Sequence, residues 1–372
     1  MISDGAASQN AELPPSTAMR ERLNERMRRV LELPLDPHGG SEYWLERQRA
    51  AGFDFRREIR DVSDLSRLGT MTPDALAARP LSYFVPRSLH ATRRDWILAQ
   101  TGGTTGRPAW SAYLRDEFEE AFVVPFLTAA AHVGFPRGEP WLYVGPSGPH
   151  IIGRAAVALA RGMDSGDPFM VDFDPRWAKK LPPDSFAAQR YLEHVVAQSL
   201  DVLTREPVGV LFTTPPLLAA LAARMNDAAR GQIRGVHYGG MRVAPALLRQ
   251  AQVEWFPGAV HLSGYGNTLF GCCLELITSP GRTPTYFPWG ERLWFTVQPG
   301  SQDGEIAPNM LPPRGRVAFT RLDETMLIIN MLERDEASLV NCPAEAPAGF
   351  GLPGLHDPGP LADAALVAAG LY

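Results

Sequence analysis

The feature that most constrains the fold is a regular alternation of apolar and amphipathic segments between residues 141 and 262. Short apolar segments predict strands at residues 141–144, 171–173, 208–213, 236–238 and 259–262. Patterns with helical spacing separate them, at residues 155–161, 185–204, 216–229 and 245–255. Strands that alternate with helices at this spacing favour a parallel sheet within an α/β core.

The character of the sequence changes along the chain, which divides it into four predicted parts. Residues 1–35 are a polar leader followed by an amphipathic helix over 18–33, and residues 36–262 hold the α/β core. Residues 263–340 are predicted to form a β-rich lobe, with strands at 272–278, 293–297, 316–321 and 326–330. Residues 341–372 are expected to form a short tail, because they are rich in proline, glycine and alanine.

Composition narrows the range of partners. The chain has 372 residues and a net charge of −5, which disfavours nucleic acid as a partner. Its most apolar stretch, residues 121–135, is interrupted by Pro125 and His132 and is too short to cross a bilayer. The three cysteines form neither a disulfide framework nor a metal-binding spacing, so we expect a cytoplasmic protein. Only two of the 36 basic residues are lysines, Lys179 and Lys180.

A segment rich in glycine and threonine follows a predicted strand at residues 96–100, and it runs Thr101-Gly102-Gly103-Thr104-Thr105-Gly106-Arg107-Pro108. Glycines let successive backbone N–H groups converge on an anion, threonine hydroxyls add donors, and Arg107 adds positive charge. In the expected order of strand, loop and helix, the segment predicts a phosphate-binding loop with Thr104, Thr105 and Arg107 as catalytic residues. An ordinary surface loop is the alternative, and the lysine and spacing of a Walker loop are absent.

The same segment resembles the signature T-[ST]-G-T-T-G-x-P-K of adenylate-forming enzymes, the superfamily of acyl-CoA synthetases, luciferases and peptide-synthetase adenylation domains. Residues 149–153 resemble the P-x-x-H-x-x-G segment of this family, residues 238–241 its G-G-E loop, and residues 263–268 its G-Y-G-x-T-E signature. Residues 333–335 resemble the R-x-R-D segment of the phenylacetate–CoA ligase branch. The resemblances follow the family's order over residues 95–340, and they imply the large N-terminal domain of the adenylate-forming fold.

The resemblance also implies roles for individual residues in binding ATP and an acid. The residues implied to contact the nucleotide are Thr101, Gly102, Gly103, Thr104, Thr105, Gly106, Gly239, Gly240, Met241, Tyr265, Gly266, Asn267, Thr268 and Asp335. The carboxylate of Asp335 is implied to accept from ribose hydroxyls, and the ring of Tyr265 to lie against the purine. Thr268 and Arg334 join the implied catalytic residues. The residues implied to contact the acid substrate are His150, Tyr143, His237, Tyr238 and Gly264.

The sequence departs from the family's pattern at three places. Leu269 stands where the family has the glutamate that holds magnesium, so Mg²⁺ is left to the phosphates and water or to Glu275. No lysine follows Pro108 to close the first signature. The residues after Asp335 are too few for the family's small C-terminal lid domain, which carries a further lysine, so we expect that lid to be absent.

These features predict an ATP-dependent ligase that converts a carboxylic acid, aryl or short acyl, into acyl-AMP with release of pyrophosphate. A small amine, hydroxyl or thiol would then take the acyl group, as in natural-product biosynthesis. Two alternatives stay open: an acyl-CoA or acyl-protein ligase, with Cys272 and Cys273 as candidate acyl acceptors, and a catalytically dead nucleotide-binding sensor. A carrier protein, a separate polypeptide that supplies the lid, and a homodimer are the open partners; nucleic acid and membrane are not expected.

Overall fold

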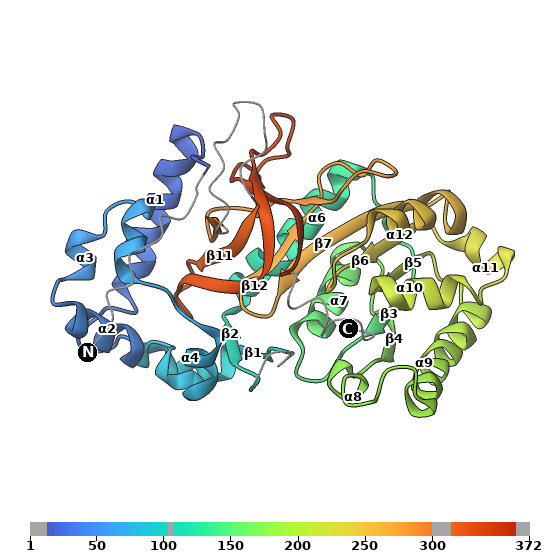
Figure 1. Ribbon diagram of the computed structural model, residues 1–372, viewed down its shortest axis with the longest axis horizontal. Helices are drawn as coiled ribbons and strands as arrows, with labels where there is room; N and C mark the ends of the chain where they lie inside the picture. The colour runs from blue at the N-terminus through green and yellow to red at the C-terminus, as the bar shows by residue number, and fades with distance from the viewer. Residues whose placement is uncertain (1–12, 103–106, 300–313, 362–372) are drawn as a thin grey trace.

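A computed structural model describes residues 13–102, 107–299 and 314–361. The alternating segments form a six-stranded sheet in the order β4-β3-β5-β6-β7-β8 (Figure 1). Its strands are β3 (Trp141–Gly145), β4 (Phe169–Asp172), β5 (Val210–Thr213), β6 (Gly235–Tyr238), β7 (Val260–Asn267) and β8 (Gly271–Leu274). Neighbouring strands from β4 to β7 are parallel, which confirms the predicted parallel sheet, and β8 is antiparallel to β7.

Helices cover both faces of this sheet, which explains why its strands are apolar on both sides. One face packs against α6 (Val124–Val133) and α7 (Ile151–Gly162), and its core includes Tyr143 and Phe212. The other face packs against α9 (Phe186–Arg205), α10 (Pro215–Ala222) and α12 (Pro245–Gln250), and its core includes Val144 and Leu211. The same region contains the shorter elements α5 (Arg115–Phe118), η4 (Glu119–Val123), α8 (Pro175–Ala178), α11 (Asp227–Gln232) and η5 (Ala251–Trp255).

A second, five-stranded antiparallel sheet forms the predicted β-rich lobe, in the order β10-β11-β12-β13-β9. Its strands are β9 (Thr285–Tyr286), β10 (Leu293–Pro299), β11 (Gly315–Arg321), β12 (Ile328–Val340) and β13 (Gly354–Pro360). Strand β12 continues well past the predicted 326–330. Strand β13 lies within the segment expected as a tail, and it is held there because Leu352 and Leu355 are buried in the core of this sheet.

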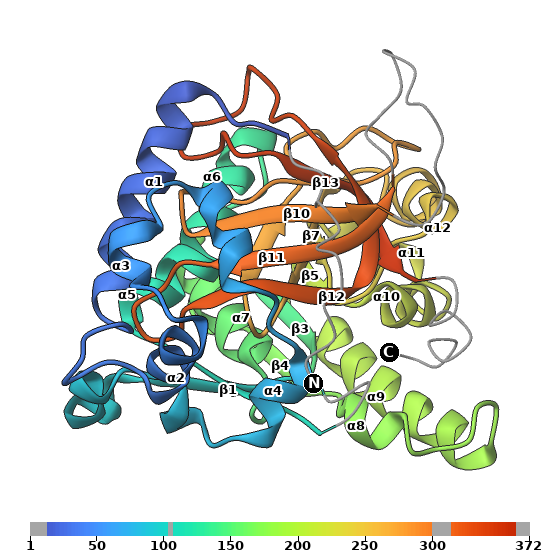
Figure 2. The ribbon, with the colours of Figure 1, turned by 60° about the vertical axis from the view of Figure 1, so that its left-hand side comes forward.

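The N-terminal helices pack against the β-rich sheet, although they precede it by some 200 residues in the sequence (Figure 2). The helices with side chains in this core are α1 (Thr17–Glu32), α2 (Glu42–Ala51), α3 (Phe55–Glu58), η1 (Val62–Leu68), α4 (Pro73–Ala78) and η2 (Leu81–Tyr83). The next helix, η3 (Arg87–Asp95), packs Leu89 in a separate small core with Val85 and Trp96. The predicted amphipathic helix is α1, and it buries Leu23 and Met27 in this core. The indole N–H of Trp44 in α2 donates to the backbone carbonyl of Leu327, at 3.0 Å.

Strand β7 joins the two parts of the molecule. Its first half, through Ser263, pairs in parallel with β6, and its second half pairs with β8 as an antiparallel hairpin. A separate hairpin, β1 (Ile97–Gln100) with β2 (Trp110–Tyr113), encloses the Gly/Thr segment. Within the described ranges, no helix is long and apolar enough to span a membrane.

Candidate active site

The segments that resemble family motifs meet at the carboxyl ends of the parallel strands. Gly239 and Gly240 follow β6, and Gly264 lies where β7 leaves the parallel sheet. The two chain segments approach so closely that a Cβ on Gly239 would lie 2.8 Å from the carbonyl oxygen of Gly264. Gly240 has φ +78°, a left-handed conformation that favours glycine. Carboxyl ends of parallel strands are where α/β folds bind ligands, so this edge is the candidate site.

Two predicted nucleotide residues contact each other although they are 70 positions apart. The hydroxyl of Tyr265, on the β7–β8 hairpin, donates to Oδ2 of Asp335 on β12, at 3.0 Å. Burial raises the pKa of Asp335, and the hydrogen bond from Tyr265 acts in the opposite direction. Burial and the two nearby carboxyl groups, those of Asp335 and Glu333, raise the pKa of Tyr265, so its hydroxyl stays protonated and can donate.

The glycine after Tyr265 is required by strand pairing. A Cβ on Gly266 would lie 2.1 Å from the carbonyl oxygen of Gly271 on β8. The close approach of the two hairpin strands therefore leaves no room for a side chain at position 266. The ring of Tyr265 itself lies 5.8 Å from the ring of Phe270 and 5.9 Å from that of Tyr286, centroid to centroid.

A second carboxyl group, which the sequence argument did not assign to the site, lies beside Asp335. Glu333 is two residues earlier on β12, and its Oε1 accepts from Nδ2 of Asn267 at 2.6 Å. Burial, followed by the charge of Asp335, raises the pKa of Glu333 to about 7. Residues i and i+2 of a strand face the same side of a sheet. The pattern Glu333-Arg334-Asp335 could therefore have indicated that Glu333 lies on the same side as Asp335.

The turn after β7 is held by its own residues and by a buried charged cluster. Asn267 Oδ1 accepts from the backbone N–H groups of Leu269 and Phe270, at 2.8 and 3.1 Å. The carbonyl of Thr268 accepts from the Tyr113 hydroxyl at 2.8 Å. Thr268, a predicted catalytic residue, is half-buried here, and the side chain of Leu269 is buried in the core of the β-rich sheet. A side chain at position 269 therefore points away from the candidate site.

The charged cluster behind this turn consists of Arg292, Arg321 and Asp323, whose side chains are at most 3% exposed. Arg321 donates to the carbonyls of Leu269 at 3.0 Å and Ala112 at 2.6 Å, and Arg292 donates to that of Phe270 at 2.5 Å. Both guanidinium groups donate to Asp323. The cluster therefore connects the 267–270 turn to β2, which follows the Gly/Thr segment. The role of this cluster in holding the turn was not predicted, because its partners come from distant parts of the sequence.

Part of the Gly/Thr segment is described, and it departs from the expected order. Gly103, Thr104, Thr105 and Gly106 lie outside the described residues. On either side, the segment enters from β1 and leaves into β2, so a hairpin replaces the predicted order of strand, loop and helix. Thr101 fixes the base of the hairpin, because its N–H donates to the Ala109 carbonyl at 2.9 Å and its Oγ1 accepts from the Ala109 N–H at 3.0 Å. Gly102 and Arg107 are exposed.

The predicted substrate residue His150 lies next to this hairpin. It precedes α7, and the adjacent Pro149 carbonyl accepts from the N–H of Gln100 at the end of β1, at 2.8 Å. His150 is half-buried. Burial, followed by the positive charge of Arg176, lowers its pKa below 6.5, so the ring is neutral at neutral pH.

The other predicted substrate residues divide between the two faces of the sheet. His237 lies on the α6/α7 face, between the rings of Phe126 and Phe212 at 4.8 and 4.3 Å, and its Nδ1–H donates to the Leu262 carbonyl. Tyr143 is on the same face, 5.0 Å from Phe212. Burial lowers the pKa of His237 to about 4, so it is neutral.

Tyr238, the next residue on β6, lies on the opposite face, in the core under α9 and α12. Adjacent residues of a strand point to opposite faces, so His237 and Tyr238 do not line one pocket. Gly264 lies next to His237, because a Cβ on Gly264 would lie 3.3 Å from Cε1 of the histidine. Met241, at the loop after Gly240, is half-buried.

Glu275 is poorly suited to hold a metal ion. Its side chain is in the core, at 4% exposure for the residue, and burial raises its pKa to about 8. A carboxyl group that is protonated at neutral pH is a poor ligand for Mg²⁺, which prefers ionised oxygen donors. Among the residues that the structure describes, no group of three His, Cys, Asp or Glu side chains could hold a metal ion.

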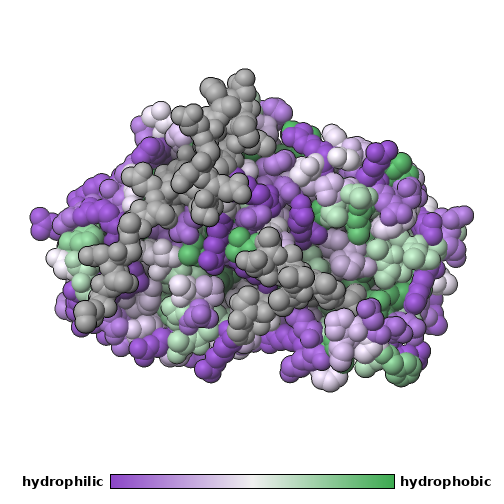
Figure 3. Space-filling model, viewed as in Figure 1, coloured by the Kyte–Doolittle hydropathy of each residue, from purple (hydrophilic) through white to green (hydrophobic). Residues whose placement is uncertain are grey.

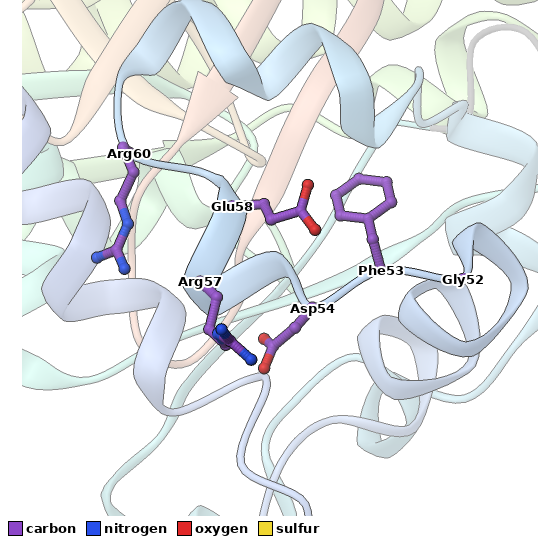
Figure 4. Close-up of a pocket in the computed structure, with 6 residues that line it drawn as sticks. All are labelled: Gly52, Phe53, Asp54, Arg57, Glu58 and Arg60. Carbon is purple, nitrogen blue, oxygen red and sulfur yellow. The ribbon is translucent and has the colours of Figure 1, made fainter.

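A hollow in the described part of the surface lies outside the candidate site. A hollow beside α2 and α3 is lined by Gly52, Phe53, Asp54, Arg57, Glu58 and Arg60, none of which is a predicted site residue (Figure 4). Its Glu58 is already paired with Arg67 at 2.6 Å. On the face seen in Figure 3, hydrophilic residues are spread over both lobes and apolar residues form separate patches.

Comparison with known proteins supports the fold. No protein-family model matches the sequence, and no curated protein matches it. The fold is similar to that in a crystal structure of 2-hydroxyisobutyryl-CoA ligase with 2-HIB-AMP and CoA, in the thioesterification state. The TM-score is 0.64 and the sequence identity is 17%, and the match covers 93% of this chain and 68% of that chain. An open conformation of that ligase is similar with a TM-score of 0.61 and 14% identity, over 92% and 75%. The chain therefore has the adenylate-forming fold that its motifs imply.

Proposed function

We propose that the protein is an ATP-dependent adenylate-forming ligase that activates a carboxylic acid. The observation that carries this proposal is the contact between Tyr265 and Asp335 at the carboxyl ends of the parallel strands. It places an aromatic ring and a carboxylate together, which is the pair that a purine and its ribose need. The fold is shared with a ligase whose structure contains an acyl-adenylate, which supports the proposed activity.

In the proposed reaction a carboxylate oxygen of the acid attacks the α-phosphorus of ATP. The bond from that phosphorus to the β-phosphate oxygen breaks, and pyrophosphate leaves with the electron pair. The acid is already ionised at neutral pH, so no general base is needed. Catalysis then rests on holding the two reactants in line and on stabilising negative charge. Arg107 and Arg334 are exposed cations next to this edge that can supply positive charge.

ATP enters this reaction as its magnesium complex, with the ion held by the phosphates and water. Glu275 does not fit the role of a protein ligand, because it is buried and protonated at neutral pH. Asp335 and Tyr265 would hold the ribose and the base. Thr101 and Gly102 would lie at the start of the phosphate-binding segment, and Gly239 and Gly240 beside the adenine edge.

The acid is proposed to be small, either aryl or short acyl. Beneath Gly264 the space on the α6/α7 face of the sheet is filled by His237, Phe212 and Tyr143. These side chains are apolar or neutral, so they favour an uncharged acyl group and leave little depth for a long one. The similar ligase binds 2-HIB-AMP, the adenylate of a small hydroxy acid, which is consistent with this choice.

The second step is proposed to pass the acyl group to a small amine, hydroxyl or thiol, in a cytoplasmic biosynthetic reaction related to that of the phenylacetate–CoA ligase branch. Coenzyme A and a carrier protein are the alternative acceptors. Internal acceptors are disfavoured, because burial raises the pKa of Cys272 to about 12 and also raises that of the fully buried Cys273. A thiol that stays protonated is a weak nucleophile.

One observation favours a second candidate, a nucleotide-binding protein without turnover. Leu269 occupies the position of the family's metal-binding glutamate, and its side chain is buried away from the site. Pyrophosphate release from ATP, measured across aryl, short-chain and long-chain acids, separates the two candidates. Release that depends on one class of acid supports the ligase. ATP binding without acid-dependent release in any reaction supports the sensor.

A further inference from the structure

The loop that follows β6 holds residues 239–241, which are expected to lie beside the adenine. Pairing of β6 with β7 ends at Tyr238, and outside the sheet this loop makes no backbone–backbone hydrogen bond within the described ranges. Gly240 in the loop has φ +78°, and glycine restricts the backbone less than other residues do. The hydrogen bonds that hold the loop come instead from the side chain of Arg242, at its end.

Arg242 pairs with Asp357 of β13, which is 115 positions away in the sequence. Its Nε donates to Oδ1 of the aspartate at 3.0 Å, and its Nη2 donates to Oδ1 and to Oδ2, at 2.8 Å each. A guanidinium that meets a carboxylate in this forked way is fixed in orientation as well as in distance. The side chains are 44% and 21% exposed, so water screens the pair only in part.

Asp357 is itself held in place by its backbone. Its N–H donates to the carbonyl of Pro284 at 3.0 Å, and its carbonyl accepts from Nη1 of Arg314 at 2.9 Å. The same nitrogen of Arg314 lies 3.6 Å from the Asp357 carboxylate. The backbone of Asp357 has φ +49°, in the left-handed region, which aspartate tolerates better than most side chains. Asp357 is therefore a fixed acceptor for Arg242.

The side chain of Arg242 crosses β13 at Gly359. A Cβ at that position would lie 2.5 Å from Cδ of Arg242, so the arginine lies against the backbone of the strand. The next residue of β13, Pro360, pairs with Asp335 on β12, the proposed ribose acceptor. The loop expected beside the adenine is thus tied to the strands that carry the ribose carboxylate, by a contact between residues outside the family motifs.

We propose that Arg242 and Asp357 are positioning residues that hold the adenine loop in register with the ribose carboxylate of Asp335. The inference rests on the proposed function, because it takes the two motifs to bind one nucleotide. Neither residue touches ATP: Arg242 acts through residues 239–241, and Asp357 acts through Arg242. This assigns a role in ATP binding to β13, which lies in the segment expected to be a tail.

Breaking the pair would leave the loop free to adopt several positions. Only a fraction of the molecules would then hold it ready for adenine, and the apparent affinity for ATP falls by that fraction. The reacting carboxylate and the α-phosphorus are not contacted by the pair. The expected signature is therefore a higher KM for ATP with an unchanged kcat, because a weaker bond to the base affects bound ATP and its transition state equally.

A double-mutant cycle tests this inference. Arg242→Gln, Asp357→Asn and the double variant would be titrated with ATP by calorimetry, and their folding checked by circular dichroism. Asparagine tolerates a left-handed backbone, so Asp357→Asn removes the charge and one acceptor oxygen without new strain. Each single variant is expected to bind ATP about fivefold more weakly than the wild type. The double variant is expected to show the same loss, because either change breaks the same pair.

Asp164→Asn is the matched control. Asp164 also has a left-handed backbone, with φ +60°, and its Oδ2 accepts from Nε and Nη2 of Arg137, at 3.1 and 2.7 Å. Arg137 precedes β3, so this pair lies at the amino ends of the parallel strands, away from the candidate site. Asp164→Asn is expected to bind ATP like the wild type. In acid-dependent pyrophosphate release, the variants at 242 and 357 are expected to raise KM for ATP about fivefold at constant kcat.

Four results would overturn the inference: unchanged ATP affinity in either single variant, losses that add in the double variant, an equal loss in Asp164→Asn, or a fall in kcat at constant KM. Wild-type protein that binds ATP but releases no pyrophosphate with any acid would refute the proposed reaction. The calorimetric cycle would then still decide the role of the pair in binding. Wild-type protein that binds no ATP would refute both.

Discussion

Two groups of charged side chains, one buried and one exposed, lie on either side of the candidate site. The buried cluster of Arg292, Arg321 and Asp323 donates to backbone carbonyls of the 267–270 turn and of β2. The exposed group, Arg107 and Arg334, lies next to the carboxyl ends of the parallel strands. Charges in the interior are surrounded by protein partners and fix the shape of the site, whereas charges at its edge can meet a ligand. The buried group should therefore affect stability, and the exposed group binding.

The largest effect is expected from breaking the buried cluster. Arg321→Met would leave Asp323 without one of the three arginines that pair with it, and would free the carbonyls of Leu269 and Ala112. Loss of one partner of a buried ion pair costs about 3–5 kcal/mol of unfolding free energy. Chemical denaturation measures this value. Arg334→Met, at the exposed group, should cost less than about 1 kcal/mol. Equal costs for the two variants would contradict the division of roles.

Removing the carboxylate of Asp335 tests the binding side of the comparison. Asp335→Ala removes the proposed ribose acceptor and the partner of the Tyr265 hydroxyl. Affinity for ATP and for AMP should fall by about tenfold or more. Glu336→Ala is the matched control, because the next residue on β12 faces the other way and its carboxylate pairs with Arg314 at 2.7 Å. If ATP binds Asp335→Ala as tightly as the wild type, the ribose assignment is wrong.

The pH dependence of ATP binding tests the carboxyl group beside Asp335. Burial, followed by the charge of Asp335, raises the pKa of Glu333 to about 7, so this group gains negative charge as the pH rises through that value. Negative charge next to a bound triphosphate is unfavourable, so the affinity for ATP should decrease over the same range.

Glu333→Gln tests this assignment, because a glutamine side chain does not ionise. The decrease near pH 7 should disappear in this variant. Retention of the whole pH profile would mean that Glu333 does not act on the bound nucleotide.

The smallest effect is expected at Tyr113, a single link between β2 and the 267–270 turn. Tyr113→Phe removes its hydrogen bond to the Thr268 carbonyl and leaves the ring in place. The expected loss is about 1 kcal/mol of unfolding free energy, with a drop in ATP affinity smaller than that of Asp335→Ala. Tyr83→Phe, which loses only a contact with Glu46 away from the site, should leave ATP binding unchanged. A larger loss of affinity than of stability would make Tyr113 a binding residue instead.

The sequence predicted the parallel sheet well, because apolar segments of three to six residues separated by helical patterns are compatible with few other folds. It also brought Tyr265 and Asp335 to one site, through their motifs. Both His237 and Tyr238 were predicted to contact the acid, although the two-residue period of a strand implies that their side chains lie on opposite faces of the sheet. The roles of Arg321 and Asp323 depend on partners from distant segments, which no local pattern reveals. Strand β13 escaped prediction because its prolines and glycines are typical of loops.

Isotope transfer from the acid tests the proposed reaction most directly. The protein would be incubated with ATP, an acceptor amine and a small carboxylic acid labelled with ¹⁸O in its carboxylate, and the products read by mass spectrometry. Attack of the carboxylate on the α-phosphorus predicts one ¹⁸O atom in AMP and none in pyrophosphate. Label in inorganic phosphate, with ADP as the nucleotide product, would show attack at the γ-phosphorus and would contradict the assignment as an adenylate-forming ligase.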